Sequence, residues 1–362
     1  MPGALSAPIF AAFSPFSAIA TLAVFLALAA GAASCSSAPS ATAASAADAG
    51  TQPDAGDADG AVLADAASAC TPFVPGADEP HAPTGGDAIV PNRLTADTAS
   101  GTVTDQATGV VYETAPADDL TFDEAACRCH DLRTAGASDW RLPSRFELDG
   151  VVDYVKVIPA LSGPAFDPTL FPSAPVSAYW TSTLFASGNP AQVNLPYVMS
   201  LGDGRVEGSF QTGQQRSAGW CVRGGNAPPT AIRFTTTEAT VTDTWTKLVW
   251  QRGSPPESQA LDHDGAAAYC AALVLEGAGG YRIPGAKELQ TIVAPGRRAP
   301  AVDTGLFPGT PSLLFHTTAP YSAQPSDTWW FVDFTDGIAV PTTVYPSSGR
   351  KAEPVRCVRS LP

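Results

Sequence analysis

The alternation of hydrophobic and polar residues occurs twice along the chain, in the same order. Residues 103–112 and 241–250 alternate Val, Leu and aromatic side chains with Thr and other polar ones, which is typical of β-strands. In 122–132 and 263–273, apolar residues recur three or four positions apart, as on one face of a helix. A repeat of roughly 135 residues has the size of a domain, so the sequence predicts two tandem copies of one domain.

Short motifs in the same order place the two copies at residues 101–225 and 236–360. An Arg-Leu-Pro or Arg-Ile-Pro turn follows the first helix, at 141–143 and 282–284. Later matches pair 170–172 with 306–308, 180–183 with 316–319, 203–204 with 336–337, and 221–223 with 357–359. Since helices come early and strands late, we expect an α+β fold with two short helices and antiparallel strands in each copy.

The second helix of each copy should begin directly after the Pro of this turn. Ser144 and Glu147 have the spacing of a capping box, in which both side chains satisfy free amides at the helix start. The second copy has Gly285 at the same position, which is a weaker cap. Residues 329–334 alternate so that every second side chain faces the core, and Asp-Gly at 336–337 predicts a hairpin turn.

The N-terminus has the pattern of an export signal. Residues 18–30 are apolar and uncharged but shorter than the ~20 residues that span a bilayer. Small residues and Cys35 follow, and this stretch resembles a bacterial lipobox, in which the Cys becomes the lipidated N-terminus. We therefore expect 1–35 to be a lipoprotein signal peptide and Cys35 to anchor the chain in a membrane. An ordinary cleaved signal is the alternative.

Residues 36–100 are expected to form a disordered tether. They begin rich in Ala, Ser, Asp and Gly and continue rich in Pro, so they bury too little apolar surface to offset the entropy of ordering. The whole chain has 35 acidic and 20 basic residues, a formal net charge of −15. This excess of negative charge argues against a nucleic-acid partner, which requires Lys and Arg.

Seven cysteines in an exported chain indicate disulfides. Cys270 lies on the inner face of the first helix of its copy and Cys357 in the last strand, and Cys129 and Cys221 hold the matching positions in the first copy. We predict one such disulfide within each copy, 129–221 and 270–357. Each would close a loop of about 90 residues and stabilise the fold by about 4–5 kcal/mol in the chain-entropy model.

Cys127 is the additional cysteine of the first copy. It lies ~200° around the helix axis from Cys129, so it faces away from the core. Cys70, at the end of the tether, is the remaining partner, and we predict a Cys70–Cys127 disulfide. The rival interpretation is a metal site made of Cys127, Cys129 and His130, but the sequence has no second half-site at zinc spacing. We expect no metal and no other cofactor, and the alternative is a calcium ion held by Asp303, Asp333 and Asp336, of which Asp336 is more simply a turn residue.

This series of motifs resembles the Lcl C-terminal domain family over both copies. The matching residues are the Trp-Arg-Leu-Pro turn at 140–143, then Leu-Phe-Pro, Trp-Thr-Ser-Thr, the Asp-Gly hairpin, and Cys-Val-Arg at 221–223. The second copy departs from the pattern at Tyr281, Ile283 and His316. The resemblance implies a C-type-lectin-like fold, a place in the bacterial cell envelope, at the outer membrane or the cell surface, and a role in adhesion. Binding of sulfated glycans transfers poorly, because neither copy has an excess of basic residues.

The predicted function is recognition without catalysis. Motifs of phosphate loops, serine hydrolases and zinc proteases are absent from the sequence. His263 and His316 take positions that Phe122 and Trp180 hold in the first copy, so packing is their expected role. Two alternatives remain. One is an envelope assembly or scaffold protein, and the other is a modifying enzyme of the formylglycine-generating type, which shares the Arg-Leu-Pro-x-x-x-Glu step but needs a reactive cysteine near its C-terminal end.

We expect a ligand site, if present, in the loops of the second half of each copy, because loops on a rigid scaffold carry recognition. The candidate ligand-binding residues are Asn189, Gln192, Asn194, Tyr321, Gln324, Asp327 and Trp329. Strand alternation turns Trp329 away from the core, where it would stack on a ligand. The alternative is that Trp329 packs on a neighbouring loop or on the other domain. The expected partner is an extracellular glycan or protein.

Overall fold

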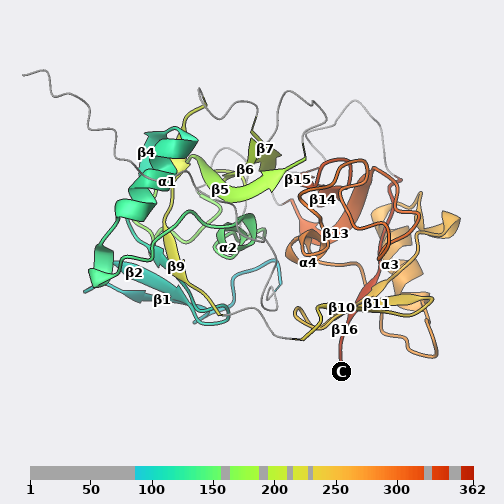
Figure 1. Ribbon diagram of the computed structural model, residues 1–362. Coiled ribbons are helices and arrows are strands. Elements are labelled where there is room, and N and C mark those ends of the chain that lie inside the picture. The colour runs from blue at the N-terminus through green and yellow to red at the C-terminus, as the bar shows by residue number, and fades with distance from the viewer. Residues whose placement is uncertain are drawn as a thin grey trace, which may run out of the picture. The chain divides into compact units, whose positions relative to one another are not determined.

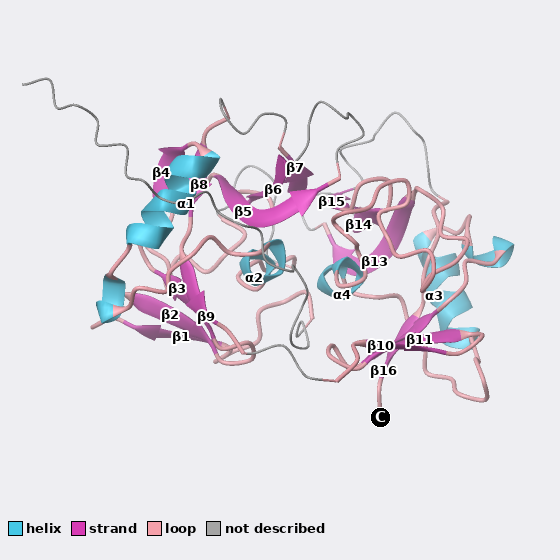
Figure 2. Ribbon diagram, viewed as in Figure 1, coloured by secondary structure: helices cyan, strands magenta, loops and turns pink. Residues whose placement is uncertain are grey.

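The computed structural model describes residues 86–155, 164–186, 195–209, 215–226, 231–321, 328–341 and 352–362 (Figure 1). All of them belong to one compact unit, Asp65–Pro362. Short helices and mostly antiparallel strands make up each copy, in agreement with the predicted α+β class (Figure 2). Among the helices in these ranges, none combines the length and the apolar character that crossing a membrane requires.

Each copy opens with a four-stranded antiparallel sheet whose last strand comes from the end of the copy. In copy one the order is β1 (Leu94–Asp97), β2 (Thr102–Asp105), β3 (Val110–Glu113) and β9 (Val222–Gly224). In copy two it is β10 (Phe234–Thr236), β11 (Thr240–Asp243), β12 (Leu248–Gln251) and β16 (Val358–Ser360). The register is also repeated, since Val103 pairs with Tyr112 and Val241 with Trp250.

Strand β1 corrects the predicted extent of the tether. All four residues of β1 pair with β2, although the composition of 36–100 predicts disorder throughout. The physical reason is Arg93, whose guanidinium donates hydrogen bonds of 3.1 and 2.9 Å to the buried carboxylate of Asp105 and so fixes the entry to the sheet. Copy two repeats this ion pair with Arg233 and Asp243. Composition averaged over a long segment therefore concealed a short strand at its end.

The second helix of each copy begins at the cap that the sequence predicts, Ser144 or Gly285. The helices are α1 (Phe122–Asp131), α2 (Arg145–Asp149), α3 (His263–Ala272) and α4 (Ala286–Gln290), with 3-10 turns at Thr134–Gly136 and Pro256–Ser258. Ser144 and Glu147 form the predicted capping box at α2. Helices α1 and α3 bury Cys129 and Cys270 on their inner faces.

The longer strands of both copies form one eight-stranded sheet. Its order is β13 (Leu314–Pro320), β14 (Trp329–Asp333), β15 (Ile338–Pro341), β7 (Val206–Gly208), β6 (Leu195–Ser200), β5 (Ala178–Phe185), β8 (Ser217–Gly219) and β4 (Ala117–Leu120). The predicted hairpin turn joins β14 to β15, and Gly337 takes the left-handed conformation there, with φ 81°. Strands β7 and β15 hold equivalent places in the two copies and pair antiparallel through Val206 and Ala339. The two copies are therefore related by a local two-fold axis at this pair.

Side chains of copy one extend into copy two near this axis. The buried guanidinium of Arg145 donates to the carbonyl oxygens of Gln290 and Gly337, at 3.0 Å in both cases. The hydroxyl of Tyr197 donates to the carbonyl oxygen of Asp336 at 2.6 Å. The largest buried apolar cluster likewise contains residues of both copies. The copies thus share a core in addition to a continuous sheet.

Candidate functional site

Two disulfides join the first helix of each copy to the start of its last strand. Cys129–Cys221 and Cys270–Cys357 have Cα–Cα distances of 5.2 and 5.4 Å, and all four side chains are buried. Both predicted pairings within the copies are therefore present. Each ties together elements that are far apart in sequence, which is where a cross-link most restricts the unfolded chain.

Cys127 lies half-buried on α1. Its predicted partner Cys70, and the predicted lipid attachment site Cys35, lie outside the described residues, so both assignments stay predictions. Within the described ranges, no three His, Cys, Asp or Glu side chains are grouped so that they could hold a metal ion. The rival metal site would also need Cys129, which is in a disulfide.

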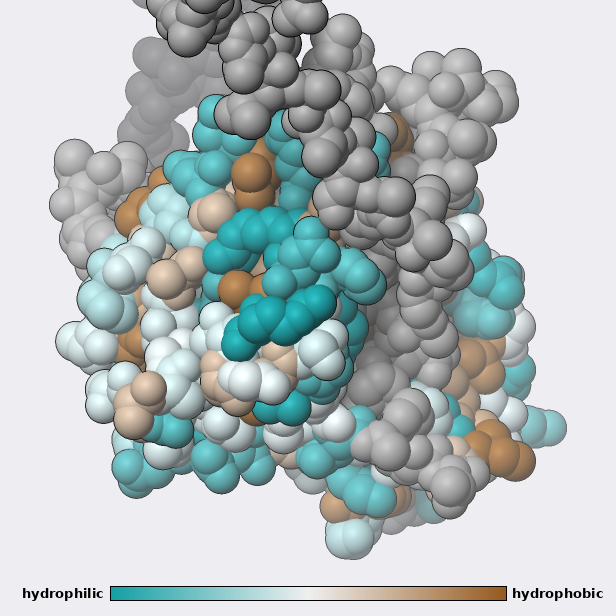
Figure 3. Space-filling view, turned by 60° about the vertical axis from the view of Figure 1, so that its left-hand side comes forward, coloured by the Kyte–Doolittle hydropathy of each residue, from teal (hydrophilic) through white to brown (hydrophobic). Residues whose placement is uncertain are grey.

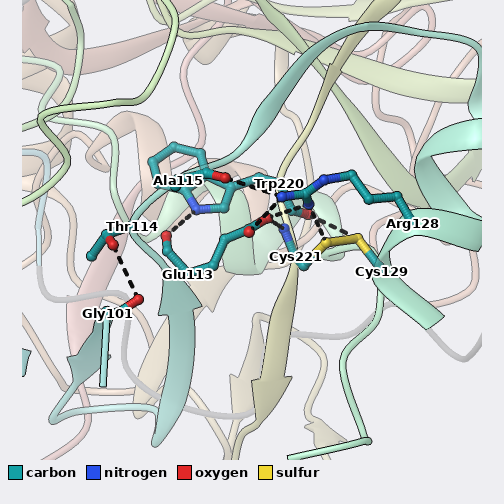
Figure 4. Close-up of polar contacts among 8 residues, drawn as sticks. All are labelled: Gly101, Glu113, Thr114, Ala115, Arg128, Cys129, Trp220 and Cys221. Carbon is teal, nitrogen blue, oxygen red and sulfur yellow. Dashed lines mark hydrogen bonds and ion pairs between the residues drawn. A yellow bond between two sulfur atoms is a disulfide. The ribbon is translucent and has the colours of Figure 1, made fainter. Parts of the chain in front are cut away.

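In copy one, an ion pair packs directly against the disulfide (Figure 4). Arg128 of α1 donates hydrogen bonds of 2.6 and 2.7 Å to the two carboxylate oxygens of Glu113 of β3, and its Nη1 lies 2.8 Å from Sγ of Cys221. The same carboxylate accepts the backbone N–H of Cys221 at 2.8 Å. Burial raises the pKa of Glu113, and the hydrogen bonds from Arg128 oppose that shift. This cluster fastens α1, β3 and the disulfide to one another.

Trp220 forms the aromatic side of this cluster. Its Nε1–H donates to the carbonyl oxygen of Glu113 at 2.8 Å. Its ring packs edge to face on Phe171, with centroids 4.7 Å apart, and lies 5.2 Å from the ring of Tyr179. Such aromatic contacts add to the stabilisation that burial of the surface provides.

Copy two fills the positions of this ion pair with uncharged side chains. Gln251 of β12 replaces Glu113, and Tyr269 of α3 replaces Arg128. The amide of Gln251 donates to the hydroxyl of Tyr269 at 2.8 Å and accepts the backbone N–H of Cys357 at 3.4 Å. The link between helix, strand and disulfide is thus kept while its charges are lost.

Arg356 stands where copy one has Trp220. The side chain is buried, and the acceptors of its hydrogen bonds among the described residues, at 2.6 to 2.8 Å, are all neutral. These acceptors are the carbonyl oxygens of Gln251 and Arg252 and the hydroxyls of Ser254 and Thr310. The guanidinium lies over the ring of Phe307, 4.8 Å from its centroid. Burial lowers the pKa of Arg356 to about 9, which reflects a cation in an apolar setting.

A partly open aromatic group lies in copy two at the start of α3. The rings of His263 and Trp329 are stacked, with centroids 3.5 Å apart and an interplanar angle of 5°, and both residues are partly exposed. Asp262 and Asp264 on either side of His263 are exposed, and Asp262 caps the helix. Burial lowers the pKa of His263, which favours the neutral imidazole. An aromatic plane flanked by carboxylates suits neutral or cationic ligands better than anionic ones.

His316 is buried next to this pair. Its Nε2 lies 2.8 Å from the carbonyl oxygen of Leu261, and its ring is 5.8 Å from that of His263. Burial lowers the pKa of His316 to about 4. In copy one, Phe122 and Trp180 pack edge to face at the same positions, 5.7 Å apart. The packing role predicted for His316 is confirmed by its burial, whereas His263 stays partly exposed and stacks on Trp329.

The structure describes two of the seven candidate ligand-binding residues. Tyr321 is 6% exposed and packs edge to face on Trp330, so its side chain belongs to the core. This corrects its place in the predicted binding surface, because the neighbouring copy and β14 cover it. Trp329 faces away from the buried Trp330, as the alternation predicts, and it stacks on helix α3 of its own copy. The other candidates, which are Asn189, Gln192, Asn194, Gln324 and Asp327, lie outside the described residues.

The face of the molecule that carries copy one is mainly hydrophilic, and its apolar residues are scattered (Figure 3). The large apolar side chains that are exposed in the described residues are likewise single and separated in sequence: Val90, Val155, Val176, Ile232 and Val274. Isolated apolar residues are normal on a protein surface. The visible, described part of this face therefore shows no large apolar patch.

Sequence reasoning missed the groups that surround the disulfides. Glu113 and Arg128 are 15 positions apart and belong to different elements, so no local pattern joins them. Comparison of the two copies could have revealed this contact. Both members of the pair change together, to Gln251 and Tyr269, and a paired exchange at matching positions indicates contact.

The model of the Lcl C-terminal domain family matches the chain twice, at residues 101–223 and 239–359. The predicted resemblance and the tandem arrangement are thereby confirmed. No curated protein matches the chain.

Proposed function

Because the chain belongs to the Lcl C-terminal domain family through both of its copies, which cover more than half of its 362 residues, we propose that it is a non-catalytic, ligand-binding or adhesion protein of the bacterial cell envelope. The lipobox-like sequence at Cys35 and the acidic segment after it support a lipoprotein displayed at the outer membrane or the cell surface. We also propose that each copy has a C-type-lectin-like fold, a relation supported by the link from first helix to last strand.

The observation that carries the binding proposal is the stacked pair of His263 and Trp329. The two rings form a stacked, partly exposed aromatic pair, and the carboxylates of Asp262 and Asp264 provide hydrogen-bond acceptors beside it. Aromatic planes with adjacent acceptors are typical of sites that hold sugars or amine-bearing ligands. We therefore expect an extracellular glycan or protein ligand that is neutral or cationic where it meets this pair.

Two further functions compete with this one. An envelope assembly or scaffold protein would also fit two copies that share a sheet and a core. A modifying enzyme of the formylglycine-generating type would require a reactive cysteine, and Cys357, the cysteine nearest the C-terminus, is used in a buried disulfide. A disulfide sulfur is not a thiolate nucleophile, which favours recognition over this chemistry.

A glycan array, followed by a pull-down from envelope extract, tests the proposal with the full chain. We expect binding by the wild type to fall at least tenfold in Trp329→Ala. The matched control is Ile232→Ala, which removes an exposed apolar side chain elsewhere and should bind as the wild type does. Equal binding by wild type and Trp329→Ala would contradict this site. Copper-dependent oxidation of a cysteine-containing peptide would instead support the enzyme.

The lipid anchor has a separate test. The wild-type chain should partition with membranes, whereas Cys35→Ala should be found in the soluble fraction after export. A Cys35→Ala variant that stays with the membrane would contradict anchoring through this residue.

A further inference from the structure

The stem, which we define as residues 86–93, contacts both copies before the chain enters strand β1. The carbonyl oxygen of Asp87 accepts the backbone N–H of Tyr154 in copy one at 3.0 Å. The carboxylate of Asp87 accepts the backbone N–H of Lys287 in copy two at 3.1 Å. One residue of the stem therefore bonds to α4 of copy two and to the segment after α2 of copy one.

Asp87 gives the start of α4 a side-chain acceptor from outside its copy, at an amide one position before the one that Ser144 serves in α2. At α2, the hydroxyl of Ser144 accepts the backbone N–H of Glu147 at 3.2 Å. The equivalent residue at α4 is Gly285, and a Cβ at that position would lie 2.9 Å from both carboxylate oxygens of Asp87. The glycine, which the sequence pattern indicates only as a weak cap, leaves room for a carboxylate that comes from outside the copy.

The titratable groups that face Asp87 lie on α2, on α4 and in the segments next to them, while β13 contributes the hydroxyl of Thr318. The titratable groups are Lys287 and Glu288 of α4, Asp149 of α2, Tyr154 after α2, and Arg282 before α4. Burial raises the pKa of Asp87 from its ordinary 3.8 to about 6, and Glu288 and Asp149 add to the shift while Lys287 opposes it. Asp153 is also near, since its carboxylate accepts the backbone N–H of Ile89 in the stem at 3.4 Å.

A protonated Asp87 can keep its contacts. One oxygen still accepts from Lys287, and the other lies 3.4 Å from the hydroxyl of Thr318, which can receive the new O–H. Because Asp87 has a higher pKa when the stem is docked, protonation of its carboxylate stabilises the docked stem, and docking in turn favours protonation.

We propose that the stem is a latch, closed by Asp87 on helix α4, whose hold on copy two strengthens as the pH falls from 7 to 5. With the latch closed, the stem is held at the contact between the two copies. With the latch open, the stem is released from copy two up to strand β1. The proposal is independent of the ligand-binding role.

Hydrogen exchange of the full chain at pH 5 and pH 7, corrected for the intrinsic effect of pH, tests the latch. In the wild type, we expect the Lys287 amide to exchange about tenfold more slowly at pH 5, because docking becomes more favourable by that factor when the two pKa values differ by about two. Asp87→Asn keeps an acceptor but cannot titrate, so this difference should vanish. Gly285→Ala should also abolish it, because the added Cβ displaces the carboxylate.

The matched control is Ser144→Ala, which removes the cap of α2. It should speed exchange of the Glu147 amide and leave the pH effect at Lys287 intact. Equal protection of Lys287 at both pH values in the wild type, or a pH effect that persists in Asp87→Asn, would overturn the latch.

Discussion

Copy one and copy two anchor their disulfides with different chemistry at the same positions. Copy one has the ion pair of Glu113 and Arg128 and the aromatic Trp220. Copy two has a neutral pair and a buried cation, Arg356. In both copies, however, the residue before the disulfide cysteine donates a hydrogen bond to the same backbone carbonyl, which belongs to Glu113 in copy one and to Gln251 in copy two.

The difference shows which feature of the junction is required. The ion pair is dispensable, since copy two links helix, strand and disulfide through the neutral pair of Gln251 and Tyr269. Both copies keep a hydrogen bond to the backbone carbonyl oxygen of the last strand residue, Glu113 or Gln251. A buried carbonyl without a partner would cost about 1–3 kcal/mol. In copy one the guanidinium belongs to Arg128 of the helix and binds a carboxylate. In copy two it belongs to Arg356, next to the disulfide cysteine, and binds neutral oxygens. A buried ion pair is not needed for stability at such a junction.

Removal of Arg356 should have the largest effect of the variants that test this comparison. Arg356→Ala leaves a cavity and several unpaired acceptors, so we expect a loss of about 3–5 kcal/mol in the free energy of unfolding. Urea denaturation of the full chain, followed by tryptophan fluorescence, measures it. Trp220→Ala is the matched variant of copy one and should cost about as much. A loss below about 1 kcal/mol in Arg356→Ala would show that the neutral acceptors find other partners.

His316 should make the stability of copy two depend on pH. The folded chain keeps this imidazole neutral down to pH 4, whereas the unfolded chain protonates it below 6.5. Its contribution is therefore complete above pH 6.5 and decreases as the pH falls from 6.5 to 4, by about 3 kcal/mol in all. His316→Phe removes this dependence.

The measurement for His316 is the difference in unfolding free energy between wild type and variant from pH 7 to pH 4. The contribution of Asp87 is the same in both proteins, so it drops out of this difference. By itself, its raised pKa would make the folded chain more stable as the pH falls over the same range. Trp180→Phe, at the equivalent position of copy one, should show no change with pH. A constant difference for His316→Phe would contradict a neutral buried imidazole.

Local patterns predicted the parts of the fold that depend on a few neighbouring residues. The capping box of Ser144 and Glu147, the turn at Gly337 and the outward direction of Trp329 all follow from spacing along the chain. The disulfides followed from the comparison of the copies. Pairing of β7 with β15 was not predictable, because it depends on how two separately patterned copies meet. The role of Asp87 was not predictable either, because the stem residue contacts Lys287 of copy two, 200 positions further along the chain.

A double-mutant cycle measures how strongly the ion pair of copy one is coupled. Glu113→Gln leaves Arg128 without its carboxylate, and Arg128→Tyr leaves Glu113 without its cation. Each should cost about 1–3 kcal/mol. The double variant reproduces the pair of copy two, so it should cost about 1–2 kcal/mol less than the sum of the single changes. The side chain of Arg128 is 24% exposed, which places the coupling below that of a fully buried pair. Additive costs would mean that the two copies are not interchangeable at this junction.

The smallest effect should come from the aromatic stack that copy one lacks. Trp329→Ala removes the ring on His263, and because both residues are partly exposed we expect a loss of about 1 kcal/mol. His263→Phe keeps an aromatic partner and should change the free energy of unfolding by less than about 0.5 kcal/mol. Thermal unfolding of the two variants side by side measures both changes. A loss above about 3 kcal/mol in Trp329→Ala would make this tryptophan a core residue. The binding proposal would then lose the residue that distinguishes copy two from copy one.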